Sequence, residues 1–345
     1  MDKAKLDALR AKYANGKGGD IHDPAFAAVA SSVFTSPDRR KWPFADVATL
    51  LGAPYRPDAA VNGFADLDVA LVGVPMDLGV TNRAGARLGP RAVRAVERIG
   101  PYEHALRVAP AGKLRFADVG DVPMESRFSL DRCHADIESW YKGVAAAGVI
   151  PLSVGGDHSI SHPILRALGA GRPVGMVHID AHCDTSGEYE GAKFHHGGPF
   201  RLAVLDGVLD PERTIQIGIR GPAEYLWEFS ADSGMTVLHA EEVDRLGLDA
   251  VIARAREVVG TGPTYVTFDV DSIDPALAPG TGTPEVGGLL PREALALVRG
   301  LSGIDIVGGD VVEVAPQYDA TTATAQIGAQ MLFELLCLVA LRDAR

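Results

Sequence analysis

From residue 66 onward, short apolar runs rich in β-branched residues alternate with longer amphipathic stretches. Strands that are apolar along their whole length and separated by helices indicate a parallel sheet covered on both faces. The pattern therefore predicts an α/β domain. The predicted strands lie at residues 68–74, 114–119, 149–154, 174–179, 214–219, 235–238, 265–270 and 304–314, and the predicted helices at 90–99, 130–147, 159–168, 240–259, 291–300 and 321–341.

The first sixty residues lack this alternation. Residues 3–13 predict one short helix, which the glycines at 16, 18 and 19 end. Prolines at irregular intervals follow, which is typical of an extended segment with short helical turns. We expect residues 1–60 to form an N-terminal arm with short helices, with partial disorder of the first twenty residues as the alternative. Residues 61–345 are expected to form a single domain.

Charge and cysteine content exclude several function classes. The net charge is −12, so phosphate neutralisation contributes nothing and we expect no nucleic-acid partner. Three cysteines at wide spacings form no disulfide framework and suit a reducing compartment. The N-terminus has no apolar segment like that of a signal peptide, and no run of 18 apolar residues occurs. We therefore expect a cytoplasmic protein with no membrane span.

Polar side chains gather where predicted strands end, which is where ligands bind in parallel sheets. Residues two apart in an extended backbone point to the same side, so each Asp-x-His-x-Asp or Asp-x-Asp segment presents its side chains together. The residues so placed are Asp180, His182 and Asp184 in VHIDAHCD and Asp269 and Asp271 in TFDVDSIDP. In SVGGDHS, two glycines allow a tight turn that presents Asp157 and His158.

Carboxylates crowded at one sheet edge repel one another unless a cation lies between them. Two divalent ions would balance the four carboxylates, and a mixed carboxylate and imidazole set suits Mn²⁺, Ni²⁺, Zn²⁺ or Fe²⁺ better than Mg²⁺ or Ca²⁺. A pair of ions about 3.5 Å apart activates water at neutral pH. Taken singly, GGDHS also reads as a capping turn and Asp-Val-Asp as a helix cap. Their occurrence at successive strand ends favours a two-metal site.

Five other residues have interpretations besides metal binding. His195 and His196 lie in the Gly-flanked loop KFHHGGPF and are candidates for a proton shuttle. Asp274 precedes a proline and is expected to form a turn. Cys183 alternates away from the ligands and reads as a small buried hydrophobe. His178 lies within an apolar run, where a hydrogen-bonded core histidine is expected.

The segments GGDHS, DAHCD, FDVDSIDP, GTGTPEVGG and VVEVAP, in this order, resemble the ureohydrolase family of arginases, agmatinases and guanidino-acid hydrolases. GARLGPRAVR and QIGIRG resemble its agmatinase branch. The resemblance runs from about residue 68 to the C-terminus. It implies an arginase-like catalytic domain with three α/β/α layers around a mostly parallel central sheet. It also implies a homo-oligomer, either a trimer or a hexamer.

The same resemblance implies two bound Mn²⁺ ions, with Ni²⁺ as the alternative. One ion would be held by His158, Asp180, Asp184 and Asp269, and the other by Asp180, His182, Asp269 and Asp271. Three roles are implied besides ligation. Asp184 would orient the nucleophile and carry its proton, His196 would shuttle protons, and Glu313 would bind the guanidinium group.

The implied reaction releases urea and an amine from a guanidino compound. Agmatine, giving putrescine and urea, is the first expectation, and guanidinobutyrate or guanidinopropionate is the alternative. Guanidine or an alkylated guanidine is a third option, which would favour nickel. Glu188 and Glu190 near the entrance favour a cationic tail, whereas Lys193 favours a carboxylate tail.

Two readings from other classes are less consistent with the residues. A silent scaffold subunit of a mixed oligomer would be expected to have lost ligands, and all six are present. A one-metal deacetylase would not need Asp271.

Overall fold

The computed structural model describes residues 1–16, 22, 24, 27, 44–97, 99–221 and 227–342. The chain divides into two compact units, Met1–Trp42 and Pro43–Arg345. In the first unit, the predicted helix is present as α1 (Lys3–Tyr13), with the Asp2 side chain accepting a hydrogen bond from the amide of Ala4. Most of the extended segment predicted after it lies outside the described residues, so the predicted arm boundary at residue 60 stays a prediction.

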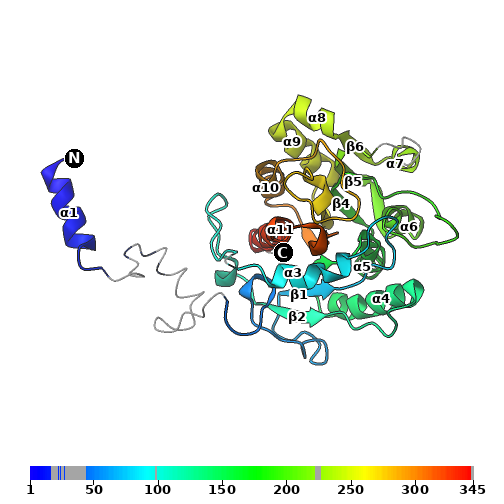
Figure 1. The fold of residues 1–345 in the computed structure, drawn as a ribbon, viewed down its shortest axis with the longest axis horizontal. Helices are drawn as coiled ribbons and strands as arrows, with labels where there is room; N and C mark the ends of the chain where they lie inside the picture. The colour runs from blue at the N-terminus through cyan, green and yellow to red at the C-terminus, as the bar shows by residue number, and fades with distance from the viewer. Residues whose placement is uncertain are drawn as a thin grey trace. The chain divides into compact units, whose positions relative to one another are not determined.

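The second unit is built on one sheet whose strands run in the order β2-β1-β3-β8-β7-β4-β5-β6, with every described pair parallel (Figure 1). All the predicted strands are present, and the prediction of a mostly parallel sheet is confirmed. The strands are β1 (Val69–Val74), β2 (Phe116–Asp121), β3 (Ile150–Gly155), β4 (Val174–Ile179), β5 (Leu209–Ile219), β6 (Thr236–His239), β7 (Thr264–Asp269) and β8 (Ile306–Val312).

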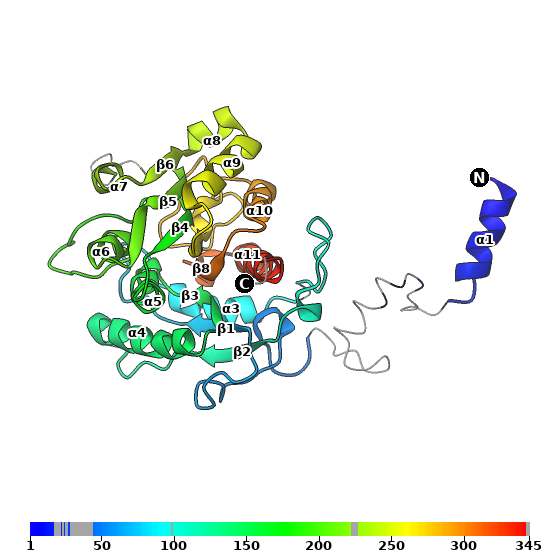
Figure 2. The ribbon, with the colours of Figure 1, turned by 180° about the vertical axis from the view of Figure 1, so that it is seen from behind.

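Helices cover both faces of the sheet. Figure 1 and Figure 2 show α4, α5 and α6 on one side and α9, α10 and α11 on the other. Alternate residues of β1 point into two separate hydrophobic clusters: Leu71 joins the cluster that contains Leu297 and Leu332, and Val72 joins the one that contains Ile137. The three-layer α/β/α prediction is confirmed. The helices of this unit are α3 (Gly89–Arg94), α4 (Leu130–Ala146), α5 (Ser161–Leu168), α6 (Pro199–Leu205), α7 (Glu228–Ser233), α8 (Ala240–Leu246), α9 (Leu248–Val259), α10 (Pro291–Gly300) and α11 (Ala323–Ala340).

Some helix predictions were wrong in detail. The single helix predicted over 240–259 is two helices, α8 and α9, because Gly247 between them has φ of 78° and interrupts the helical backbone. The short helices α6 and α7 were not predicted, since six or seven residues carry too little periodicity. The predicted helix over 90–99 ends at Arg94.

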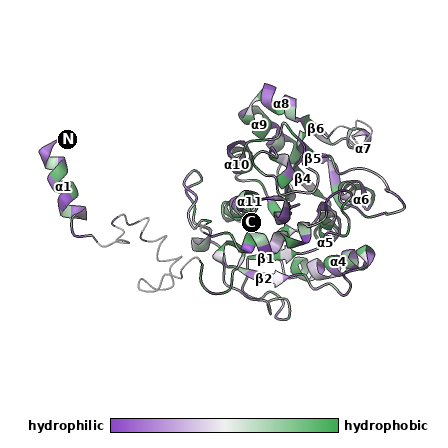
Figure 3. Ribbon diagram, in the orientation of Figure 1, coloured by the Kyte–Doolittle hydropathy of each residue, from purple (hydrophilic) through white to green (hydrophobic). Residues whose placement is uncertain are grey.

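Helix α11 is the one helix in the described part of the chain that is long and apolar enough to cross a membrane (Figure 3). The helix is not a continuous apolar run, since it includes Gln326, Gln330 and Glu334, and 78% of it is buried inside the structure. Within it, the buried Glu334 accepts two hydrogen bonds from Arg299 of α10. This burial is what the core helix of an α/β domain shows.

Candidate metal centre

The predicted site residues follow four strands that are neighbours in the sheet, in the order β3-β8-β7-β4. His158 follows β3, Glu313 follows β8, and Asp269 and Asp271 lie at the end of β7. The segment from Asp180 to Asp184 follows β4. Because the carboxyl ends of parallel strands meet at one edge, residues more than 150 positions apart in the chain are brought together.

The turn after β3 is shaped by a glycine and an aspartate. A Cβ at Gly156 would lie 1.6 Å from the carbonyl oxygen of Met76, so only glycine fits there. The carboxylate of Asp157 accepts hydrogen bonds from the amides of Ser159, at 3.0 Å, and Gly79, at 2.8 Å. Asp157 therefore caps the turn, and His158 is the residue that it presents to the site.

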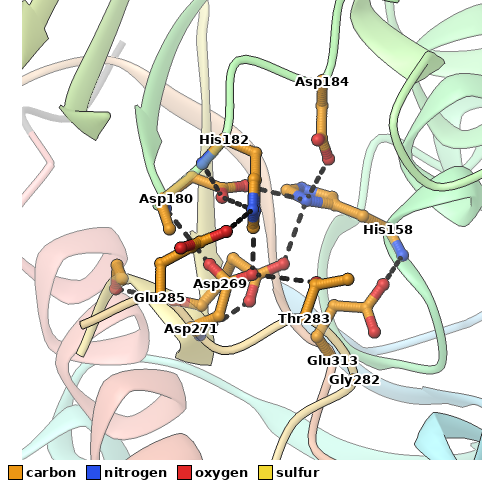
Figure 4. Close-up of polar contacts among 12 residues, drawn as sticks. His158, Asp180, His182, Asp184, Asp269, Asp271, Gly282, Thr283, Glu285 and Glu313 are labelled. Carbon is orange, nitrogen blue, oxygen red and sulfur yellow. Dashed lines mark hydrogen bonds and ion pairs between the residues drawn. The ribbon is translucent and has the colours of Figure 1, made fainter. Parts of the chain in front are cut away.

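One group of predicted ligands surrounds a single ring nitrogen. Nδ1 of His158 lies 2.9 Å from Asp184 Oδ2, 3.1 Å from Asp180 Oδ2 and 3.3 Å from Asp269 Oδ2 (Figure 4). The opposite nitrogen, Nε2, lies 2.8 Å from the hydroxyl of Thr267. His158 is fully buried, so these three carboxylates surround its Nδ1 away from solvent. We call this group the enclosed position.

The other group is more open to solvent. Nδ1 of His182 lies 3.1 Å from Asp271 Oδ2 and 3.6 Å from Asp180 Oδ1, while its Nε2 lies 3.6 Å from Glu285 Oε1 (Figure 4). The side chain of His182 is 24% exposed. Asp180 contacts both groups, and Asp269 connects them through a 2.8 Å hydrogen bond from the amide of Asp271. We call the group Asp180, His182, Asp269 and Asp271 the open position.

The electrostatics of the cluster require positive charge. Burial and the charges of Asp271 and Asp180 raise the pKa of Asp269 well above its usual range. Burial and the charge of Asp180 raise the pKa of Asp271 to about 6. Burial opposes the charged form of His158, but hydrogen bonds with Asp180, Asp184 and Asp269 raise its pKa well above the usual value. A divalent metal pair would displace these protons, and four carboxylates with two imidazoles match its donor set.

His178 also lies at the cluster. Its Nε2 is 2.6 Å from Asp180 Oδ2 and its Nδ1 is 3.0 Å from the amide nitrogen of Gln216. It is fully buried, so the expectation of a hydrogen-bonded core histidine is confirmed. Its donor atom also lies within 4.8 Å of those of His158, Asp180 and Asp184. Two further expectations hold: Cys183 is buried, and Asp274 accepts turn hydrogen bonds from Ala276 and Gly287.

Glu313 and His196 lie beside the enclosed position. Oε1 of Glu313 accepts hydrogen bonds from the amide of His158 and from Nδ1 of His196, both at 2.8 Å. The Nε2 of His196 lies 2.7 Å from the hydroxyl of Thr81. His195 points elsewhere, since its Nε2 lies 2.7 Å from the carbonyl oxygen of Gly187. The structure thus brings His196, and not His195, into the site.

Two of these acidic residues have unusual backbones. Asp184 has φ of 52° and Glu313 has φ of 64°, which is the left-handed region that favours glycine. Strained conformations of this kind persist where the surrounding structure imposes them, and they gather at functional sites. Oε2 of Glu313 is buried and has no hydrogen-bond partner among the described residues. Burial alone would lower the pKa of His196, but the charges of Glu313, Asp157 and Asp184 raise it to about 9.

Comparison with known proteins identifies the family. Residues 67–337 match the model of the Arginase family. The chain belongs to the arginase family. It is 52% identical to guanidinopropionase of Pseudomonas aeruginosa over 88% of this chain and 94% of that protein. It is 47% identical to mitochondrial agmatinase of Gallus gallus, covering 79% and 81% of the two chains. The structure of proclavaminate amidino hydrolase from Streptomyces clavuligerus matches with a TM-score of 0.82 at 35% identity, covering 87% and 99%.

These findings confirm the predicted family, fold and enzyme class. This arginase-family chain is an agmatinase-like ureohydrolase, which hydrolyses carbon–nitrogen bonds other than peptide bonds. The family uses two divalent metal ions, and the chain has two groups of His and Asp side chains that could hold them. The individual ligand and catalytic roles stay predictions.

Sequence reasoning missed several residues that support the site. Thr267 bonds to His158, Thr81 bonds to His196, and the hydroxyl of Thr283 lies 3.3 Å from Asp271 Oδ2. Glu285 lies beside His182. The segment GTGTPEVGG contains Thr283 and Glu285, so it offered a signal, but a single threonine before a strand end or in a loop offers none.

Proposed function

We propose that this enzyme hydrolyses the terminal guanidino group of a small linear substrate, releasing urea and an amine, with agmatine as the first candidate. The observation that carries the proposal is the side chain of Glu313. Its Oε2 is a buried carboxylate oxygen that no described residue bonds to, and its Oε1 is fixed by His158 and His196. A guanidinium group is the cation that pairs best with a carboxylate, since its N–H groups form a planar fork.

Two divalent cations fit the donor set of the site. His158, Asp180, Asp184 and Asp269 would hold one ion at the enclosed position, and Asp180, His182, Asp269 and Asp271 the other at the open position. We propose Mn²⁺, with Ni²⁺ as the alternative, since imidazole and carboxylate ligands suit both. When bound, the pair supplies a water-derived nucleophile at neutral pH and polarises the substrate.

The side chains of the protein bind the substrate and move its protons. Glu313 would orient the guanidinium carbon toward the carboxylate cluster and stabilise the charge that builds up on its nitrogens. As the new carbon–oxygen bond forms, the carbon–nitrogen bond to the leaving amine breaks, and that nitrogen needs a proton. With its pKa at about 9, His196 is protonated at neutral pH and can donate it. Asp184 would accept the proton of the attacking water.

A guanidino acid is the second candidate substrate. The relative with 52% identity is a guanidinopropionase, whereas the one with 47% identity is an agmatinase. Lys193, which would favour a carboxylate tail, is exposed with its Nζ 5.2 Å from the centre of the Phe194 ring. Glu188 and Glu190, which would favour an amine tail, are exposed as well. Guanidine and alkylated guanidines remain a third option.

We also propose that the enzyme is a cytoplasmic homo-oligomer, a trimer or a hexamer, with no nucleic-acid partner. The acidic net charge and the cysteine content support the location and the absence of a nucleic-acid partner. Size-exclusion chromatography with light scattering tests the assembly.

Urea release from a panel of guanidino compounds tests the proposed function. The metal-free enzyme is reconstituted with Mn²⁺ or Ni²⁺ and given agmatine, guanidinobutyrate, guanidinopropionate, arginine, guanidine or an alkylated guanidine. We expect metal-dependent urea from agmatine, with a guanidino acid as the next best substrate. A Glu313→Gln variant, which keeps the size of the side chain but removes its charge, should lose this activity. Two bound metals without urea from any compound would overturn the proposal.

A further inference from the structure

Arg220, just past the end of β5, donates hydrogen bonds to five backbone carbonyl groups. Its Nη2 bonds at 2.7 Å to the carbonyl oxygens of Asp271 and Glu285, and Nε bonds at 3.1 Å to that of Val286. Nη1 bonds to those of Gly218, at 3.2 Å, and Ser272, at 3.3 Å. In the described part of the chain its guanidinium forms no ion pair. An arginine whose guanidinium bonds only to backbone carbonyl groups holds those backbone segments in place.

The segments that Arg220 joins are the ones that carry the open position. Asp271 is a predicted ligand, and Ser272 follows it. Glu285 lies beside the imidazole of His182, and the neighbouring Thr283 lies beside the Asp271 carboxylate (Figure 4). The amide of Arg220 itself bonds at 2.8 Å to the carbonyl oxygen of Ala181, between two further ligands. The guanidinium of Arg220 therefore ties two loops, at Asp271–Ser272 and at Glu285–Val286, to the end of β5. The backbone amide of the same residue bonds to a third loop beside the same ion.

The loop from 281 to 288 has few other anchors at its outer end. Its base is tied by the carboxylate of Asp274, which accepts from the amides of Gly287 and Gly288. Val286 is 80% exposed, so packing does not hold the tip. The enclosed position has no such dependence, because His158 and Thr267 are both fully buried. Arg220 bonds to residues of the open position, whereas His158 and Asp184, which only the enclosed position has, lie outside its hydrogen bonds.

We propose that Arg220 is a positioning residue that sets the affinity of the open position for its metal ion, while the enclosed position is independent of it. This inference rests on the proposed metal pair. Lysine in its place would keep the charge but lose the fork of donors, so it could not reach all five carbonyl groups. We expect Arg220→Lys to lower the affinity of the open position for its metal ion by about tenfold or more, as the loss of a group that orients a ligand does.

Calorimetric titration of metal-free protein with Mn²⁺, together with metal analysis after dialysis, tests this. The wild type should bind two ions per chain. Arg220→Lys should bind one with unchanged affinity and the other at least tenfold more weakly. Turnover should recover at high Mn²⁺. Adding His158→Ala to Arg220→Lys should remove the retained ion, and adding His182→Ala should not. Arg299→Lys, which disturbs a half-buried arginine bonded to Glu103 and Glu334, is the control and should bind both ions normally.

The outcomes separate the two proposals. A wild type that binds fewer than two ions would overturn the proposed metal pair. A wild type with two ions and an Arg220→Lys variant with unchanged affinities, or with both affinities reduced alike, would overturn the role of Arg220 alone. If Arg220→Lys gives no folded protein, Gly288→Ala serves instead. It keeps the arginine, but its added Cβ would lie 2.6 Å from Nη2 and 2.4 Å from the backbone nitrogen of Asp274. It therefore displaces the guanidinium and the base of the same loop together, and a selective loss at the open position is again expected.

Discussion

The enclosed and open positions share two carboxylates but are built differently. The histidine of the enclosed position, His158, is fully buried and bonds to Thr267 inside the sheet, whereas the side chain of His182 is 24% exposed and lies beside Glu285 on a loop. The predicted ligands of the enclosed position are fixed by strand ends and core packing. Those of the open position depend on loops joined by hydrogen bonds. The protein should therefore bind the two proposed ions with different affinities.

The largest effect is expected from Asp271→Ala, which removes a carboxylate from the open position alone. Bound metal should fall from two ions to one per chain. Turnover should fall about 10³-fold, because a metal ion contributes several kcal/mol to the transition state and about 1.4 kcal/mol corresponds to a factor of ten.

The fold should survive this change, since the pKa of Asp271 shows that its charged form is disfavoured in the metal-free cluster. Urea assays, metal analysis and thermal melting check the three expectations together. Near-normal urea release from Asp271→Ala would contradict the two-metal reading.

The next largest effect is expected from His196→Ala. Loss of a general acid typically costs about 10²-fold or more in turnover, and metal content should not change. Because the pKa of His196 is raised to about 9, the imidazolium persists below that pH and is lost above it. Wild-type turnover should therefore decline as the pH rises through about 9, and the variant should lack this decline. Loss of a metal ion from His196→Ala would instead make His196 a ligand.

The difference between the two positions also explains how much the sequence could predict. The site follows strands whose apolar runs are unmistakable, and the Asp and His residues directly after those runs mark one edge of the sheet. The sheet, its layers and the six clustered side chains could therefore be predicted. Asp180 to Asp184 follow β4 as bends and loop and do not continue it as an extended strand. Helices α6 and α7 could not be predicted, because six or seven residues are too few to show a helical period of apolar residues. The break at Gly247 could not be predicted either, because the apolar pattern continues across it.

The supporting contacts could not be predicted either, for a different reason. Arg220 acts through its guanidinium on backbone groups up to 66 residues away, and Thr81 reaches His196 across 115 residues. Such contacts depend on how loops are arranged, and no local pattern encodes them. The left-handed backbones of Asp184 and Glu313 are likewise imposed by the surrounding fold, since neither residue type favours that region as glycine does.

Two matched variants, one at each metal position, should have effects of intermediate size on metal affinity. Thr267→Val removes the hydroxyl beside His158 Nε2 inside the core, and Glu285→Gln removes the charge beside His182 Nε2. Groups that orient a metal-binding histidine contribute about 10- to 100-fold to metal affinity. We expect Thr267→Val to lower the affinity of the enclosed position for its ion by an amount near the upper end of this range, because the buried Nε2 of His158 is left unpaired.

Glu285→Gln should weaken only the open ion, by about tenfold, since its partner is half-exposed and 3.6 Å away. Titration of each metal-free variant with Mn²⁺ measures both affinities. If both variants weakened the same ion, the division into two independently built positions would be wrong.

The smallest effect concerns stability on the enclosed side, where His134 bonds to Ser159 next to His158. Burial, helped by the charge of His162, lowers the pKa of His134 to about 3, from 6.5 when unfolded. Between pH 3 and pH 6.5 the unfolded chain binds more protons at His134 than the folded protein does. The contribution of the neutral histidine to stability is therefore complete above pH 6.5 and is lost as the pH falls toward 3. The loss is at most about 1.4 kcal/mol per pH unit. In His134→Gln the metal-free protein should melt lower than wild type at pH 7, and the gap should narrow by pH 4. His104→Gln, at a side chain that is 85% exposed, is the control. If the difference in melting temperature between wild type and His134→Gln stayed constant across this pH range, His134 would contribute no pH dependence to stability. The environment around His134 would then not disfavour its protonated form.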